Sequence, residues 1–288
     1  MNASVVVPTK DRPEKLHSCL AALTARAPRA TEVIVVDDGS GERSLVADIV
    51  RDAGARLVRL AGKGPAAARN AGIEAAGGDV VCFTDDDCEP EPGWVEALVA
   101  PIVAGEARCA AGLTLVAADA SAADRAWQAI ANELQRAAAA PGSPSPGFAP
   151  TCNLACSRGL LDELPFDESF PAAAGEDRDW SARAAARGSA PRFVPNAVVV
   201  HRPDLDARSF LRQQYRYGRG AARFRATDAD RSLGSASFYA SLLRAGFAEG
   251  AGAGILVVAA QFATAAGVFA EVSAPAEARR RARRNRHR

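Results

Sequence analysis

The sequence predicts an α/β fold built on a doubly wound, mostly parallel sheet with helices on both faces. Short β-branched runs alternate with helical patterns from the first residues onward, and this alternation is typical of parallel α/β sheets. Three of the runs end in polar or acidic turns, at residues 8–12, 37–40 and 84–87. Because ligands of open α/β sheets bind beyond the carboxyl ends of the strands, these turns mark the expected site.

The first hundred residues divide into repeated strand–helix units. Each expected strand is a short apolar run, and Pro65 suits the first turn of one of the helices. The expected strands are residues 4–7, 32–36, 56–60 and 80–83, and the expected helices are residues 13–27, 43–53, 65–76 and 94–103.

The second half is less regular. A loop at 141–147 is rich in proline, glycine and serine. The expected strands are residues 109–117, 151–156 and 192–200, and the expected helices are residues 122–140, 158–163, 181–187 and 210–220. Strand patterns stop after residue 209, so we expect an α/β domain over 1–205 and a helical extension over 206–288.

Two common nucleotide-binding motifs are absent from the sequence. The turn after the first strand lacks the pattern GxGxxG, and GxxxxGK[ST] occurs nowhere. This excludes a NAD-type Rossmann site and a P-loop. A nucleotide bound here would instead meet carboxylates at its base and ribose, and a metal ion at its phosphates.

Three consecutive aspartates, Asp85, Asp86 and Asp87, follow the apolar run 80–83. Adjacent carboxylates repel one another unless a cation lies among them. Hard oxygen ligands suit Mg²⁺ or Mn²⁺, which could hold a diphosphate. The alternative is a solvated acidic loop that caps the next helix.

Two other features have both a functional and a structural interpretation. Glu176 and Asp177 begin a helix, where acidic side chains are favoured by the helix dipole in any case. His201 ends a strand, and a single histidine is more often structural than a ligand.

The composition argues for a cytoplasmic protein that does not bind nucleic acid. The net charge is +1, and residues 279–288 hold seven arginines, so subtracting those seven charges leaves −6 for the rest. The six cysteines form no CxxC pair, which favours a reducing compartment. Residues 5–7 are too short an apolar run for a signal peptide.

Residues 250–270 form an uncharged stretch of 21 residues dominated by alanine and glycine. The stretch is long enough to span a bilayer, but its hydrophobicity is marginal and spanning would oppose the positive-inside tendency. We expect a packed or interfacial helix hairpin. Residues 279–288 would then be disordered or contact anionic lipid at the inner face of the cell membrane.

Five motifs, in this order, resemble the family 2 glycosyltransferases of GT-A fold. The resemblance covers roughly residues 1–205. The motifs are VVVPTKDR at 5–12, VVDDGS at 35–40, ARNAG at 68–72, FTDDDCEP at 83–90 and GEDRDW at 175–180.

The resemblance implies metal-dependent, inverting transfer of a sugar from a UDP-, dTDP- or GDP-sugar to an acceptor hydroxyl, with Mg²⁺ or Mn²⁺ as cofactor. It implies Asp177 as the catalytic base, kept ionised at its helix N-terminus. It implies Asp87 and His201 as metal ligands. The implied nucleotide-sugar contacts are Pro8, Thr9, Asp11, Asp38, Arg69, Asn70, Asp85 and Asp86. The implied sugar or acceptor pocket residues are Asn153, Glu176 and Trp180.

Two alternatives remain open. A sugar-phosphate nucleotidyltransferase also combines a parallel sheet with acidic metal ligands, but the glycine-rich basic signature after its first strand is absent here. A non-catalytic nucleotide-sugar-binding protein of the same fold is the other alternative. The presence of Asp85, Asp87 and Asp177 argues against it.

Overall fold

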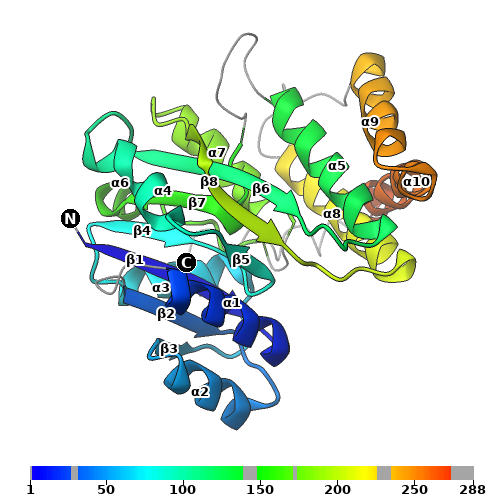
Figure 1. The fold of residues 1–288 in the computed structure, drawn as a ribbon. Helices are drawn as coiled ribbons and strands as arrows, with labels where there is room; N and C mark the ends of the chain where they lie inside the picture. Colours follow the sequence, from blue (N-terminus) through cyan, green and yellow to red (C-terminus); the bar gives the residue numbers. More distant parts are fainter. Residues whose placement is uncertain (1, 27–31, 139–147, 171–173, 226–234, 274–288) are drawn as a thin grey trace.

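The computed structural model describes residues 2–26, 32–138, 148–170, 174–225 and 235–273. In these residues an eight-stranded sheet runs in the order β3-β2-β1-β4-β7-β6-β8-β5, with helices on both faces (Figure 1). The strands are β1 (Ala3–Thr9), β2 (Glu32–Asp37), β3 (Arg56–Arg59), β4 (Val80–Phe83), β5 (Cys88–Pro90), β6 (Cys109–Val116), β7 (Leu154–Ser157) and β8 (Arg192–His201).

Most of the described helices overlap a predicted helix, but the helix Ala236–Ala248 was expected only as part of the helical extension, and the helix predicted at 181–187 begins earlier, at Glu176. The helices are α1 (Pro13–Arg26), α2 (Arg43–Asp52), α3 (Pro65–Ala75), α4 (Trp94–Val103), α5 (Ala122–Ala138), α6 (Arg158–Glu163), α7 (Glu176–Ala185), α8 (Ala207–Arg225), α9 (Ala236–Ala248) and α10 (Ala251–Ser273). The predicted loop at 141–147 and the arginine-rich tail at 279–288 lie outside the described residues.

The predicted α/β class is confirmed, with a sheet that is mixed. Strands β1 to β4 pair in parallel, as do β6 and β8. The pairs β4–β7, β6–β7 and β5–β8 are antiparallel. The chain order reverses at β1, which has β2 on one side and β4 on the other, and such a switch point is where α/β sheets form ligand sites.

Two local predictions need correction. Thr151–Asn153 is a 3₁₀ turn, and the strand expected at 151–156 begins only at Leu154. Strand β5 was not predicted, because its three residues include Glu89 and Pro90, which strands disfavour. The short strand pairs with β8 and places Cys88 opposite His201.

The central strands are buried on both faces, which explains their continuous apolar runs. Val5 and Val7 of β1 pack in one core with helices α1, α2 and α4, whereas Val6 packs in the other core with α3, α6 and α7. Alternate residues of a strand point to opposite faces, so one run of valines fills two cores.

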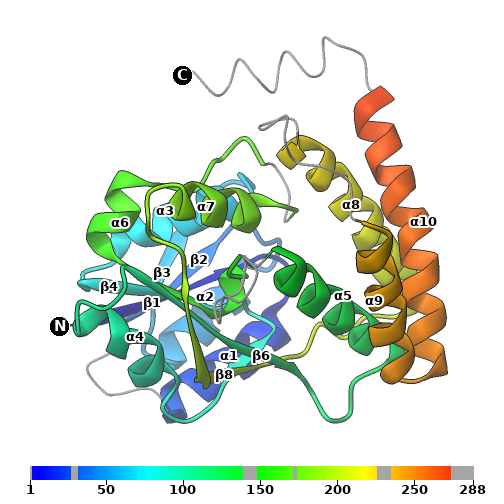
Figure 2. The same ribbon diagram turned by 90° about the horizontal axis from the view of Figure 1, so that it is seen from above.

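Helices α5, α8, α9 and α10 form a third layer beside the sheet (Figure 2). They share a small apolar core that includes Phe210, Leu242 and Val257. Helix α10 packs very closely on α8, since a Cβ added at Gly218 would lie 2.1 Å from the Thr264 carbonyl oxygen. The helix hairpin expected at 250–270 is instead a single helix, α10, which packs on α8. Among the described helices, α10 is also the one whose length and apolar composition would allow it to cross a membrane.

Candidate active site

The acidic turn after β4 lies at the carboxyl edge of the sheet, where the turns after β1 and β8 also end. The Thr9 hydroxyl donates a 2.7 Å hydrogen bond to Asp86. The backbone N–H of Arg202 donates to the Asp87 carbonyl oxygen at 2.8 Å. Three turns that are distant in the sequence are thus joined through the aspartate cluster.

Asp86 faces the protein interior. Its carboxylate is fully buried and lies 2.6 Å from Nη2 of Arg12. Burial raises the pKa of Asp86 to about 7, and the Arg12 guanidinium opposes that shift. The prediction that Asp86 contacts the nucleotide sugar is wrong, because this carboxylate positions Thr9 and Arg12. Thr9, predicted to line the same pocket, is itself buried.

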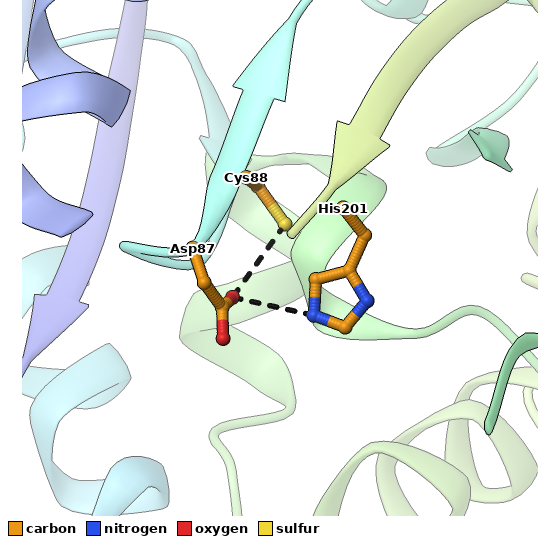
Figure 3. Close-up of side chains that lie close together, drawn as sticks. All are labelled: Asp87, Cys88 and His201. Atoms are coloured by element: carbon orange, nitrogen blue, oxygen red, sulfur yellow. Dashed lines mark hydrogen bonds and ion pairs between the residues drawn. The ribbon is translucent and has the colours of Figure 1, made fainter. Parts of the chain in front are cut away.

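Asp87 pairs with His201 across the β5–β8 contact (Figure 3). Oδ1 of Asp87 lies 3.4 Å from Nε2 of His201 and accepts a 3.9 Å contact from the Cys88 thiol. Burial opposes ionisation of Asp87, but His201 and Arg12 together hold the pKa of its carboxyl well below its usual range. Burial likewise opposes the charged imidazole, yet the Asp87 carboxylate raises the pKa of His201.

The Asp87–His201 pair has the chemistry of a divalent-metal site. Ligand atoms of Asp87, Cys88 and His201 all lie within 4.8 Å of one another. Burial raises the pKa of the Cys88 thiol well above its ordinary value, and a protonated thiol is a poor ligand. Nδ1 of His201 is buried without a hydrogen-bond partner among the described residues. A carboxylate oxygen and Nε2 of the imidazole fit a metal such as Mn²⁺.

Arg69 joins the acidic turn to the start of α7. Its Nη2 lies 3.1 Å from Oδ1 of Asp85, and its Nη1 lies 3.0 Å from Oε1 of Glu176. Arg69 and Glu176 are both buried. The two residues lie between the turn after β4 and the start of α7, and their ion pair fixes the position of α7 relative to β4.

Asp177 occupies the next position on α7 and is partly buried. Burial and, to a smaller extent, the adjacent Glu176 carboxylate raise the pKa of Asp177 to about 7. Burial of Asp177 thus opposes the ionisation that the helix N-terminus favours. A carboxylate with a pKa near neutrality is suited to accept a proton at physiological pH.

A second group of contacts lies beyond β1 and β2. Both carboxylate oxygens of Asp38 accept backbone N–H groups, from Lys63 at 2.7 Å and Gly64 at 2.8 Å. Asp11 has a φ of 54° and accepts the Gly41 N–H at 2.8 Å. These bonds hold the turns after β1, β2 and β3 together at the same edge of the sheet.

Two of the predicted pocket residues make their contacts in the core instead. Asn153 is fully buried, accepts from Trp94 Nε1, and donates to the carbonyl oxygens of Leu113 and Ala197. Trp180 is fully buried, and its Nε1 donates to the Leu164 carbonyl oxygen. The prediction that these two line a pocket is wrong, because tertiary packing uses all their polar atoms.

The Asn70 side chain also makes structural contacts. It accepts from the Phe166 backbone N–H, and its Nδ2 donates to the Phe166 carbonyl oxygen and to Glu168. This side chain holds the segment that follows α6.

Three further side chains lie at the site, and no sequence pattern indicated them. Arg12 contacts both Asp86 and Asp87. The Trp127 ring lies 4.4 Å from the His201 ring, and its Nε1 donates to the Tyr217 hydroxyl at 3.4 Å. Burial raises the pKa of Tyr217, and the nearby Asp177 carboxylate adds to the shift. Trp127 and Tyr217 therefore extend from the metal side of the site toward Asp177. Basic and aromatic residues are common in helical patterns, so nothing in the sequence indicated that these side chains lie at the site.

Comparison with solved structures identifies the fold class. The chain superposes on mannosyltransferase PcManGT from Pyrobaculum calidifontis, solved with GDP-Man and Mn²⁺, with a TM-score of 0.61 over 98% of this chain and 79% of that one at 19% identity. It also matches glucosyl-3-phosphoglycerate synthase from Mycobacterium tuberculosis, solved with Mn²⁺, UDP and glucosyl-3-phosphoglycerate, with a TM-score of 0.56 over 77% of this chain and 79% of that one at 20% identity. The fold is the GT-A fold of these glycosyltransferases.

The family follows from the sequence comparison. The description Glycosyl transferase family 2 matches residues 4–164, more than half of the chain. The chain is 30% identical over 230 residues to pre-mycofactocin glycosyltransferase of Mycobacterium tuberculosis, covering 77% of this chain but 47% of that relative. It is 27% identical over 234 residues to glycosyltransferase AglE of Haloferax volcanii, covering 75% of this chain and 72% of that relative. The chain belongs to glycosyltransferase family 2, and it spans about half the length of the mycobacterial relative.

Proposed function

We propose that this chain transfers a sugar from a nucleoside-diphosphate sugar to an acceptor hydroxyl, with a divalent metal and with inversion at the anomeric carbon. One observation carries the proposal. The Asp87–His201 pair and Asp177 belong to turns that converge on one edge of the sheet, with Arg69 bridging Asp85 and Glu176 between them.

Asp87 and His201 would hold the metal ion. A bound divalent cation would neutralise the negative charge that develops on the departing diphosphate. Mg²⁺ prefers oxygen ligands, and a site with an imidazole nitrogen is better suited to a transition metal. We therefore propose Mn²⁺ in preference to Mg²⁺. Both structural neighbours described above were solved with Mn²⁺.

The nucleoside would lie over the turns after β1 and β2, beside Pro8, Asp11 and Asp38. These turns are held together by the contacts of Asp11 with Gly41 and of Asp38 with Lys63 and Gly64. The neighbours bind GDP-Man and UDP, which supports a UDP-, dTDP- or GDP-sugar as donor.

Asp177 would act as the general base. As the acceptor oxygen bonds to the anomeric carbon and the bond to the diphosphate oxygen breaks, the hydroxyl proton would pass to the Asp177 carboxylate. Arg69 and Glu176 position α7 for this step. A single direct displacement inverts the configuration of the sugar.

The alternative of a sugar-phosphate nucleotidyltransferase loses support, because the matched family is one of glycosyltransferases. A measurement of donor turnover distinguishes the proposed enzyme from a non-catalytic protein of the same fold. The test is donor turnover with Mn²⁺ across UDP-, dTDP- and GDP-sugars, with the anomeric configuration of the product read by NMR. The proposal predicts metal-dependent release of an inverted product, and a retained configuration would contradict it.

We also propose that the chain works at the cytoplasmic face of the cell membrane in peripheral contact with anionic lipid. The outward side of α10 carries an apolar row that includes Ile255, Phe262 and Phe269, with the two phenylalanines 74% and 73% exposed. Arg212 and Arg216 are exposed on the neighbouring α8, and the sequence after α10 holds seven arginines at 279–288. Apolar residues beside arginines are typical of helices lying in a membrane surface.

The opposite side of α10 argues against a membrane-spanning role. Gly218 and Gly267 bring α8 and α10 into backbone contact, and Val257 and Ala260 are buried in the shared core. A spanning α10 would have to give up this packing. An interfacial position keeps it and uses only the exposed row.

A further inference from the structure

The two carboxylate oxygens of Asp87 have different partners. Oδ1 lies 3.4 Å from Nε2 of His201, and Figure 3 shows the other oxygen directed away from the imidazole. That second oxygen, Oδ2, lies 2.8 Å from Nη1 of Arg12. The candidate metal ligand therefore has an imidazole on one side and a guanidinium on the other.

Arg12 contacts this carboxylate from a fixed backbone position. Its carbonyl oxygen accepts the Leu16 N–H in the first turn of α1, and it follows β1, where the strand order of the sheet reverses. Its Nη2 lies 2.6 Å from Oδ1 of Asp86, which is fully buried. One nitrogen thus anchors the guanidinium, while 44% of the Arg12 side chain is exposed to solvent.

Other cations around the aspartate turn are held by protein groups. Arg69 is only 5% exposed and is paired with two carboxylates. Lys15 donates to two backbone carbonyl oxygens and pairs with Asp204. Among the described ion pairs, Arg12 is the exposed guanidinium that contacts Asp87. An anion that binds beside this carboxylate would therefore meet Arg12.

A metal ion on Asp87 and the Arg12 guanidinium would compete for the charge of one carboxylate. The ion would also repel the guanidinium, because both are positively charged. A diphosphate held by the same ion would lie beside Arg12, since the ligands of one metal ion are neighbours. Arginine binds phosphate oxygens through parallel N–H groups, so the diphosphate offers Arg12 a new partner.

We propose that Arg12 is a donor-binding residue that exchanges partners, leaving Asp87 for the donor diphosphate when the metal and the donor bind. This inference rests on the proposed metal-dependent transfer. Nη2 stays on Asp86, which keeps the guanidinium within reach, and Nη1 moves to a phosphate oxygen. Arg12 thus opposes binding of the metal alone and favours binding of the metal with the donor, so the two ligands bind cooperatively.

The variant that tests the exchange has to leave no buried charge unpaired. Arg12→Met alone would remove the cation that pairs with Asp86, which is strongly destabilising. Asp86→Asn is therefore the background in which Arg12→Met is introduced. Arg12→Gln in the wild-type chain is the second variant, because its amide can still donate to Asp86. Arg51→Met in the Asp86→Asn background is the matched control, since it removes an exposed positive charge on α2.

The binding of Mn²⁺ alone is measured from the paramagnetic resonance signal of the free ion. The binding of UDP, dTDP and GDP is measured by calorimetry at saturating Mn²⁺. Both Arg12 variants should bind Mn²⁺ alone at least about threefold more tightly, because a competing contact is removed. They should bind the preferred nucleotide at least about tenfold more weakly, as loss of a charged hydrogen bond predicts. Arg51→Met should leave both affinities close to those of its background.

A purely structural role of Arg12 predicts weaker binding of both ligands in its variants. That result, an unchanged Mn²⁺ affinity, an unchanged nucleotide affinity, or absence of nucleotide binding to the Asp86→Asn protein in Mn²⁺ would overturn the inference. Failure of the proposed function is separate, because it would appear as absence of Mn²⁺-dependent donor turnover in the wild-type chain, whereas binding of Mn²⁺ alone needs no turnover.

Discussion

Nη1 of Arg69 lies 3.0 Å from Oε1 of Glu176, and both side chains are only 5% exposed. This pair connects α3 to the first turn of α7, and Asp85 extends it to the acidic turn after β4. Removing one partner of a buried ion pair leaves a buried charge without compensation, which costs far more than the pair itself contributes.

Arg69→Leu should therefore destabilise the protein by about 3 kcal/mol and strongly reduce transfer, because α7 loses its link to the aspartate turn. Urea unfolding measures the first effect. Arg51→Ala removes an exposed arginine that pairs with Asp48 and Asp52, and should leave the stability close to that of the wild type, because exposed ion pairs contribute little. Equal losses in the two variants would show that the buried pair has no special role.

Asp177→Asn should lower the transfer rate by about 100-fold or more, as loss of a general base does, while donor and metal binding are retained. Since the pKa of Asp177 is raised to about 7, wild-type kcat/KM should rise with pH and level off above neutrality. A pH profile checks this. A rate independent of pH between 5 and 8, or near-normal transfer by the variant, would contradict the assignment of the base.

The Asp177 carboxylate should lower the stability of the folded protein over the same pH range in which it raises kcat/KM. The raised pKa means that the folded state retains the Asp177 proton over a pH range in which the unfolded state has lost it, so this group's contribution to stability falls as pH rises toward 7. Asp177→Asn removes that dependence. Urea unfolding at pH 8 should find the variant more stable than the wild type, and a less stable variant would show that burial of the charge is not costly.

His201→Ala should reduce activity and remove the preference for Mn²⁺ over Mg²⁺, because the remaining oxygen ligand suits both ions. Titrating each metal against donor turnover measures the preference. His17→Ala, at an exposed histidine on α1, should retain the wild-type ratio. A His201 variant with an unchanged ratio would exclude the imidazole as a ligand.

Phe262→Asp combined with Phe269→Asp should greatly weaken binding to vesicles that contain anionic lipid, because both side chains are exposed on the apolar side of α10. Vesicle cosedimentation measures the effect. Deleting residues 279–288 should weaken binding at low salt in particular, since charge attraction is screened by salt. Unchanged vesicle binding in both variants would contradict the proposed contact with the membrane.

Local patterns were sufficient to predict most of the fold. Strand β4 and helices α4 and α6 have the expected bounds, because an apolar run or a helical period lies entirely within each segment. Strand β5 is stable only through its pairing with β8, and no pattern in three residues could indicate that. The antiparallel direction of β7 likewise depends on its neighbours β4 and β6.

The residue types at the site could be predicted more readily than their orientation. The run Asp85–Asp87 gives three identical side chains, and only the turn geometry directs Asp86 inward and Asp87 toward His201. Asn153 was misassigned because its partners are 40 or more residues away in the chain. Trp127 reaches His201 only because α5 packs beside the ends of β6 and β8.

The predicted division at residue 205 stays a prediction. Helix α5 belongs to the first part by sequence, yet Ala126 and Ile130 of α5 share a core with Phe210 and Leu242 of the helical extension. The helical layer thus includes a segment from each predicted part. A boundary drawn from strand patterns alone could not show this.

The metal–diphosphate site is tested most directly by calorimetric titration of UDP- and GDP-sugars with and without Mn²⁺, in the wild type and in Asp87→Asn. We predict that one donor binds tightly only with Mn²⁺, and that Asp87→Asn abolishes the effect of the metal while weak binding of the nucleoside remains. Donor binding of equal strength with and without Mn²⁺, or a full metal effect in Asp87→Asn, would contradict the proposal that Asp87 holds the ion.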